Sequence, residues 1–337
     1  LITSNTLSSS KIVKKLKLKK IVHQFFPIDT NFHSKKFLEY WRPTCSFFID
    51  SEIWPNMIFN LKKKEIPIVL LNGRITKKTF RRWRIFSSFA RKIFVIFDLC
   101  LSSSNESKKY LNNLGAKKVK HIGNLKFSQS EKDESQISKN LKQIIETKKT
   151  WCASSTHHNE EKICGNVHIQ LKKKYKNLLT IIIPRHTHRV DYIEDELKKL
   201  KLVSCRLSSN QNIKGETDIL IVDSYGKTKS FYHSCKNVFL GGSLINHGGQ
   251  NPLEAARYGC NILHGPNVFN FKEIYKFLKT NKMSIEVNNQ KKMIYNLNNY
   301  FKKKIISKKI QKKLNLIGKK ILSSTHNEIN QFLNNEI

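Results

Sequence analysis

The order of apolar and polar runs constrains this chain more than any other feature. Short apolar runs alternate with longer, lysine-rich amphipathic stretches along the sequence. This alternation is typical of parallel β-strands joined by crossover helices, so it predicts an α/β fold. The expected strands are residues 19–26, 46–49, 66–71, 93–97, 118–123, 150–154, 178–184, 202–207, 218–223, 237–242 and 260–265.

The length of the chain predicts two domains. Its 337 residues exceed the size at which a single hydrophobic core usually stops growing. The segment 128–140, "SQSEKDESQISKN", is polar, charged and poor in large apolar residues, as linkers are. We therefore expect a first domain over residues 1–127, a linker region over 128–145, and a second domain with C-terminal helices over 146–337. Both domains are expected to be Rossmann-like and to face each other across a cleft.

The net charge is +37, from 62 Lys and Arg against 25 Asp and Glu. Such a charge suggests an anionic partner: nucleic acid, a membrane surface or a phosphorylated substrate. A coding bias explains much of it equally well, because 52 of these residues are Lys scattered among Asn and Ile. The ten Arg are more informative. Their guanidinium groups suit phosphate and carboxylate, and seven of them form two clusters: Arg74, Arg81, Arg82, Arg84 and Arg91, then Arg185 and Arg189.

The cysteines and the apolar runs exclude several protein classes. Seven cysteines without a C-x-x-C pair indicate reduced thiols, and they argue against a zinc site or a disulfide framework. No apolar run approaches the ~18 residues of a membrane-spanning helix. The lysine-rich segment 302–320 has the spacing of an amphipathic helix. It can pack on the neighbouring domain or lie on an anionic membrane.

The segment 241–259, "GGSLINHGGQNPLEAARYG", combines two glycine pairs with a predicted helix start. Asn251 is expected as N-cap, Pro252 as the first helical residue and Glu254 two positions later, and capping alone explains these three. It does not explain the glycines, which let a ligand approach the main chain beside a helix terminus that attracts anions. We expect a nucleotide here, with Glu254 accepting ribose hydroxyls and the glycine backbone admitting a phosphate.

Other polar residues follow the expected strands, where α/β folds bind their ligands. Arg185 directly follows the apolar run "IIIP" and suits a phosphate or carboxylate clamp. His186 and His188 lack acidic or Cys partners at the spacing of a metal site. Asp50 and Glu52 follow the strand "SFFI", where they can stabilise charge or simply cap a helix.

The series "HQFFPID", "SEIWPN", "IPIVLLNGRIT", "GNLKF", "ASSTHHNEE", "PRHTHR", "GGSLINHGGQNPLEAA" and "GPNVFNFKEI" resembles the bacterial 3-deoxy-D-manno-octulosonic acid (Kdo) transferases. The resemblance implies a two-domain GT-B glycosyltransferase with CMP-Kdo as donor and the lipid A precursor lipid IVA as acceptor. It implies inversion at the anomeric carbon, with no metal and no cofactor. It also places the protein at the cytoplasmic face of the bacterial inner membrane, with an anionic membrane surface but no nucleic acid as partner.

The resemblance also assigns roles to individual residues. Asp50 and Lys126 match positions that stabilise the transition state, although Asp50 is usually Glu and Lys227 replaces a usual Glu. The family's general base, a Glu in an S-x-G-E motif, and its membrane anchor are expected upstream of residue 1. The CMP contacts match Pro184, Arg185, Tyr225, Gly226, Lys227, Asn251, Pro252, Leu253 and Glu254.

Two alternatives remain open from the sequence. A basic RNA-binding protein without catalysis would explain the charge, and it would bind polyanions with a steep salt dependence and no preference for CMP. A GT-B transferase that uses another nucleotide sugar would explain the glycine loop and Arg185 equally well.

Overall fold

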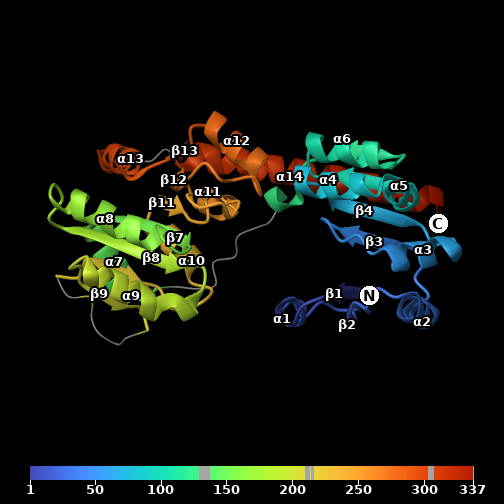
Figure 1. The fold of residues 1–337 in the computed structure, drawn as a ribbon, viewed down its shortest axis with the longest axis horizontal. Helices are drawn as coiled ribbons and strands as arrows, with labels where there is room; N and C mark the ends of the chain where they lie inside the picture. The colour runs from blue at the N-terminus through green and yellow to red at the C-terminus, as the bar shows by residue number, and fades with distance from the viewer. Residues whose placement is uncertain (129–136, 209–212, 214–215, 303–306, 337) are drawn as a thin grey trace. The chain divides into compact units, whose positions relative to one another are not determined.

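The structure is a computed structural model that describes residues 1–128, 137–208, 213, 216–302 and 307–336. It divides into two compact units (Figure 1). Unit 1 comprises residues 1–125 and 321–337, and unit 2 comprises residues 126–320. The long C-terminal helix therefore starts in unit 2 and ends in unit 1, whereas we expected the whole C-terminal part in the second domain.

Unit 1 is built on a parallel four-stranded sheet in the order β3-β4-β5-β6, with a separate parallel pair β1-β2. Its elements are β1 (Ile2–Ser4), α1 (Leu7–Lys15), β2 (His23–Phe25), α2 (Asn31–Trp41), β3 (Ser46–Ile49), α3 (Pro55–Lys63), β4 (Ile68–Gly73), α4 (Lys77–Ile85), α5 (Ser87–Phe94), β5 (Leu99–Ser102), α6 (Asn105–Leu114) and β6 (Val119–His121).

Helices cover both faces of the four-stranded sheet. On one face, Leu70 of β4 and Cys100 of β5 pack with apolar side chains of α2, α3, α5 and α6. On the other face, Val69 and Leu99 pack against Phe332. This alternation along the strands is the period of two that a sheet buried on both faces requires. Burial of Phe332 explains why the end of the C-terminal helix belongs to unit 1.

Unit 2 is built on a parallel seven-stranded sheet in the order β13-β12-β11-β7-β8-β10-β9. Its elements are η1 (Leu125–Ser128, which begins at the last residue of unit 1), α7 (Lys139–Thr147), β7 (Lys149–Thr156), α8 (Glu160–Lys172), β8 (Leu178–Pro184), η2 (Thr187–Arg189), α9 (Val190–Lys199), β9 (Ser204–Arg206), β10 (Ile219–Ile221), α10 (Thr228–Ser234), β11 (Asn237–Leu240), α11 (Leu253–Arg257), β12 (Asn261–His264), α12 (Lys272–Thr280), β13 (Ser284–Glu286), α13 (Gln290–Lys302) and the start of α14 (Ser307–Glu336).

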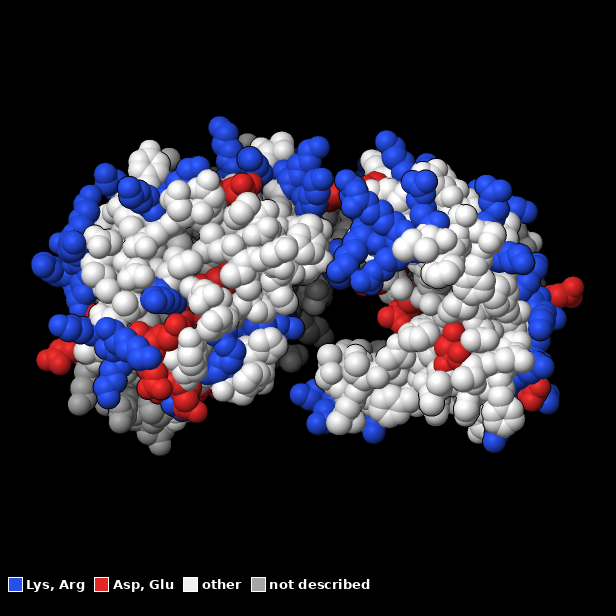
Figure 2. All heavy atoms as spheres, in the orientation of Figure 1, with Lys and Arg blue, Asp and Glu red and all other residues white. Residues whose placement is uncertain are grey.

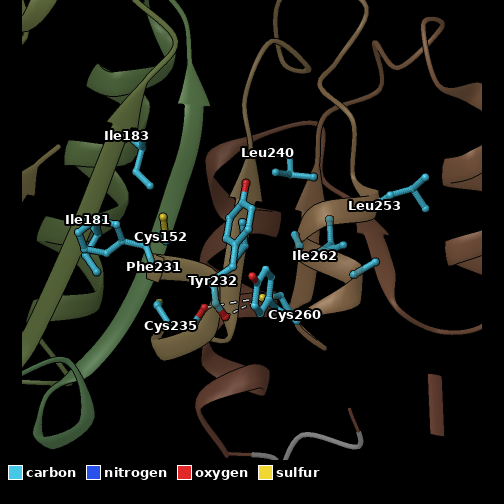
Figure 3. Close-up of a cluster of buried hydrophobic side chains, with 14 of the residues drawn as sticks. Cys152, Ile181, Ile183, Phe231, Tyr232, Cys235, Leu240, Leu253, Cys260 and Ile262 are labelled. Carbon is cyan, nitrogen blue, oxygen red and sulfur yellow. Dashed lines mark hydrogen bonds between the residues drawn. The ribbon is translucent and has the colours of Figure 1, made fainter. Parts of the chain in front are cut away.

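Successive residues of the central strand β7 point to opposite cores. Trp151 and Ala153 pack with α8, α9 and α13, whereas Cys152 packs with α7, α10, α11 and α12. Figure 3 shows this second core, where Phe231 and Tyr232 of α10 lie between the strands and Leu253. The unit is therefore a three-layered, doubly wound α/β domain.

The structure corrects three details of the sequence analysis. Residues 93–97 are not a strand: Ile93 and Phe94 end α5 and pack into the core, and the strand begins only at Leu99. The opening residues 1–10, "LITSNTLSSS", suggest a strand followed by a loop, but helix α1 follows strand β1 there. Residues 139–145 of the expected linker belong to helix α7 (Lys139–Thr147), whose Leu141 and Ile145 are buried in unit 2. Residues 129–136 lie outside the described part.

Every other expected strand overlaps an observed one, and β13 was not expected. Among the described residues, no helix combines the length and apolar character that crossing a bilayer requires.

Candidate functional site

The polar segments selected from the sequence follow the carboxyl ends of four neighbouring strands of unit 2. Strands β11, β7, β8 and β10 are adjacent and parallel, so their carboxyl ends lie at one edge of the sheet. At this edge β7 has a register shift around Ser155, whose φ of 55° lies in the left-handed region. Strain of this kind is concentrated at functional sites.

The glycine-rich loop after β11 is held by a buried carboxylate. Glu160, at the start of α8, is fully buried. Its carboxylate accepts hydrogen bonds from the backbone N–H groups of Gly242 (2.7 Å), Ser243 (3.1 Å), Leu244 (3.0 Å) and His157 (3.0 Å). Burial raises the pKa of Glu160, and the four N–H donors oppose that shift. The expectation that the glycine backbone admits a phosphate is therefore wrong for Gly242, because Glu160 already accepts its N–H together with those of Ser243 and Leu244.

Gly241 has a separate role in this edge. A Cβ at Gly241 would lie 2.5 Å from the backbone oxygen of Ser155 and 2.6 Å from the Cα of Thr156. The loops after β7 and β11 thus approach each other so closely that only glycine fits. Gly241 therefore joins two strand ends, and the nucleotide interpretation does not depend on it.

The predicted start of α11 is shifted by one residue. Pro252 is the N-cap, and the helix is the five-residue segment Leu253–Arg257. Asn251 still caps it, because its Oδ1 accepts the N–H of Leu253 at 3.1 Å. Glu254 is half-buried. The pKa of the nearby Tyr232 hydroxyl is raised, chiefly by burial and further by Cys152 and Glu254.

Arg185 and Tyr225 come together at the ends of β8 and β10. A hydrogen bond to Thr187 lowers the pKa of the exposed Tyr225, and the nearby Arg185 lowers it further. The side chain of Arg185 is exposed, while its backbone N–H donates to Thr156 at 3.0 Å. Pro184, immediately before it, is buried. The arrangement leaves an arginine and a tyrosine hydroxyl available to an anionic ligand at the sheet edge.

Three histidine rings pack at the same edge. The ring of His157 lies 4.1 Å from that of His247 and 5.8 Å from that of His186, measured between centroids. Burial, and then the neighbouring His247, His186 and Arg189, lower the pKa of His157 to about 4. His157 Nε2 lies 3.2 Å from the amide nitrogen of Gln250. No group of three or more His, Cys, Asp or Glu in the described part of the chain could hold a metal ion.

Asp50 stands at the carboxyl end of β3 in unit 1. Its φ is 59°, again left-handed, and its carboxylate accepts a hydrogen bond from the side-chain amide of Asn72. Asn72, at the end of β4, accepts the N–H of Leu125 at 2.9 Å. Glu52, two residues after Asp50, is exposed and accepts a hydrogen bond from Trp54 Nε1 at 2.9 Å. Glu52 also accepts from Asn5 Nδ2 at 3.0 Å, so both carboxylates have side-chain partners within unit 1.

Lys126 belongs to unit 2. Its backbone oxygen accepts a hydrogen bond from Arg257, and its ammonium lies 6.0 Å from the ring centroid of Phe271. The other residues of the predicted CMP site, Gly226 and Lys227, lie in the turn that leads into α10. Gly226 is exposed, and a Cβ there would meet open space.

Sequence reasoning missed Glu160, because an acid at a helix start is favourable there without any further role. It also missed His157 and Gln250. The segment "ASSTHHNEE" contains two adjacent acids with different partners. Glu161 accepts two hydrogen bonds from Arg189, at 2.9 and 3.2 Å, whereas Glu160 holds the loop after β11. The sequence could not show that Glu160 contacts a loop 82 residues away.

Comparisons with known proteins agree with this architecture. Residues 1–129 match the family model described as 3-Deoxy-D-manno-octulosonic-acid transferase (kdotransferase). A 3-deoxy-D-manno-octulosonic acid transferase from Haemophilus influenzae is 31% identical over 85% of this chain and 68% of the relative. One from Rickettsia prowazekii is 32% identical over 99% of this chain and 73% of the relative.

Among solved structures, UDP-GlcNAc 2-epimerase from Neisseria meningitidis, bound to UDP-GlcNAc, aligns with a TM-score of 0.62. The alignment covers 98% of this chain and 90% of the epimerase, with 13% identical residues. The similarity concerns the fold, which is of the GT-B type with two α/β units, as predicted.

Proposed function

Because the chain belongs to the 3-deoxy-D-manno-octulosonic acid transferase family, we propose that it is an inverting glycosyltransferase that moves Kdo from CMP-Kdo to a lipid A precursor such as lipid IVA. The reaction belongs to lipopolysaccharide synthesis. Its acceptor is a membrane lipid, so we place the protein at the cytoplasmic face of the inner membrane. The observation that carries the proposal is the meeting of Arg185, Tyr225 and the loop held by Glu160 at one sheet edge.

The donor is proposed to bind at this edge of unit 2. Arg185 is the charge partner of the CMP phosphate, because Glu160 already takes the glycine-loop N–H groups. Tyr225, Gly226 and Lys227 contribute from the turn after β10. Glu254 is proposed to accept ribose hydroxyls, and Pro184, Asn251, Pro252 and Leu253 are proposed to contact the nucleotide.

Calorimetric titration with CMP and UMP tests the donor site without requiring turnover. We expect CMP to bind in preference to UMP, and Arg185→Ala and Glu254→Ala each to weaken CMP binding at least tenfold, the loss of roughly one charge-assisted hydrogen bond. The control is Arg206→Ala on β9, whose guanidinium pairs with Asp191 and Glu194 (each 2.5 Å). Equal affinity of the wild type for CMP and UMP would refute the CMP donor, and unchanged binding in Arg185→Ala would refute its role.

Asp50 and Lys126 are proposed to stabilise charge during transfer. Transfer breaks the bond between the anomeric carbon and the phosphate oxygen, so positive charge develops on the sugar ring and negative charge on the departing CMP. A carboxylate stabilises the former and an ammonium the latter. Asp50→Asn and Lys126→Ala should lower kcat while CMP affinity is retained. Glu52→Gln, a neighbouring carboxylate with its own partner Trp54, is the matched control. A normal kcat in Asp50→Asn would contradict the assignment.

A further inference from the structure

Helices α4 and α5 of unit 1 carry a basic and partly apolar surface that the donor site does not use. The two helices contain seven Lys and Arg and no Asp or Glu. Figure 2 shows Lys and Arg on the visible face of unit 1 around α4. We call this the α4–α5 surface; its residues are Lys77, Lys78, Arg81, Arg82, Arg84, Ile85, Phe86, Phe89, Arg91 and Lys92.

The surface is apolar as well as basic. No residue of α4 is buried. At its end, Ile85 is 74% exposed and Phe86 is 66% exposed, and Phe89 in α5 is 43% exposed. A general excess of lysine does not produce this composition, because four of the ten arginines of the chain lie on this surface. Exposed large apolar side chains beside basic ones are typical of segments that lie at a membrane interface.

Two of these arginines line one pocket. The pocket has a volume of about 670 Å³ and is lined by Arg84 and Arg91, with Ser87, Ser88 and Asn113 as further polar groups. Five polar side chains around one opening, two of them cationic, suit a phosphate group.

Packing holds the guanidinium of Arg84 and the aliphatic stem of Arg91. Arg84 lies over the Phe80 ring, 5.9 Å from its centroid. That ring stacks on Tyr110 of α6 with centroids 4.3 Å apart. The stem of Arg91 lies against Gly115, where a Cβ would be only 3.0 Å from the Arg91 Cγ. One acid beside this stack, Glu106, accepts a hydrogen bond from the Tyr110 hydroxyl at 3.0 Å.

We propose that the α4–α5 surface docks unit 1 onto an anionic lipid bilayer, with a headgroup phosphate between Arg84 and Arg91 and the side chains of Ile85 and Phe86 in the interface. Basic residues attract the anionic surface, and the apolar side chains add burial that a purely electrostatic contact lacks. The inference rests on the proposed function for the reason that the acceptor is a lipid, but its test does not involve the donor site.

The test is cosedimentation of the full chain with phosphatidylcholine vesicles, with and without phosphatidylglycerol. The double variant Arg84→Ala/Arg91→Ala should lower partitioning onto phosphatidylglycerol vesicles about tenfold or more. The control, Lys35→Ala/Lys36→Ala on α2, removes the same charge from exposed positions of unit 1 and should have a much smaller effect. A second variant, Ile85→Ser/Phe86→Ser, changes only exposed side chains and should lower partitioning severalfold at constant charge.

The outcomes separate the possible explanations. Equal losses in the arginine and lysine double variants would show that total charge alone drives binding, and would overturn the proposal. Unchanged partitioning in Ile85→Ser/Phe86→Ser would also overturn the proposal. If the arginine variant lost RNA binding as well, the surface would be a nucleic-acid site. CMP titration of each variant reports separately on the donor site. Normal CMP binding with lost partitioning supports the docking surface, whether or not Kdo transfer is demonstrated.

Discussion

Replacement of Glu160 by Gln tests whether one carboxylate holds the donor-site loop. Oε1 accepts from Ser243 and Leu244, and Oε2 accepts from His157 and Gly242. Gln has nearly the same shape but only one acceptor oxygen. Its amide NH₂ would therefore face two backbone N–H groups that can only donate.

The cost follows from these contacts. A buried donor left without an acceptor costs roughly 1–3 kcal/mol. Two such donors, either those of His157 and Gly242 or those of Ser243 and Leu244, give a loss of roughly 2–6 kcal/mol in the free energy of unfolding. For a protein of this size, we expect the melting temperature to fall by roughly 5–20 °C. CMP affinity should fall as well, because the loop leads directly to Gln250 and Asn251.

The assay is thermal unfolding of the full chain together with CMP titration well below the melting temperature. The matched control is Glu161→Gln. Glu161 is just as buried but pairs with Arg189 instead of the loop. It should destabilise the protein and leave CMP affinity near that of the wild type. If Glu160→Gln has the same melting temperature as the wild type, the loop N–H groups have other acceptors and the reasoning is refuted.

Three further predictions concern other parts of the structure. The pKa of His157 is about 4 when folded and near 6.5 when unfolded, so the unfolded chain binds more protons between these pH values. The free energy of unfolding should therefore fall by roughly 3 kcal/mol on acidification from pH 6.5 to 4. In urea titrations, the free energy of unfolding of His157→Gln should depend less on pH over this range. Chemical denaturation of Gly241→Ala should show a free energy of unfolding about 3 kcal/mol lower, because the new Cβ clashes with Ser155. Gly226→Ala, in open space with a φ of +82°, should lower it by only about 1 kcal/mol. Equal losses in the two variants would contradict this reasoning. Phe332→Ala should destabilise unit 1 by about 3 kcal/mol, seen as faster amide hydrogen exchange in β4 and β5, and unchanged exchange there would show that the helix end contributes nothing.

Local sequence was enough for most of the fold because the apolar runs are strong and short. Strands such as residues 178–184 are buried on both faces of a parallel sheet, so they appear in the sequence as continuous apolar runs. The bounds of such a run give the bounds of the strand. The prediction failed at 93–97, where β-branched and aromatic residues suggested a strand. There, tertiary packing of Ile93 and Phe94 at the end of an amphipathic helix prevailed over local propensity.

The candidate site was predicted less completely. Arg185 was selected because it follows a strand and Tyr225 through the family resemblance, and the parallel sheet brings them together. The glycines were correctly singled out, but their role was not, since an N–H group that serves a ligand and one that serves a buried carboxylate look identical in sequence. Only the partner distinguishes them, and Glu160 lies more than eighty residues away.

The sequence by itself therefore determined the α/β class, the edge of the sheet where polar residues gather, and the family. These depend on local periodicity and on short motifs, which are properties of neighbouring residues. The tertiary structure decided that Glu160 fills the glycine loop, that Gly241 joins two strand ends, and that the last helix returns to unit 1. Each of these depends on contacts between residues distant in the chain, which are fixed only when the sheets and helices pack.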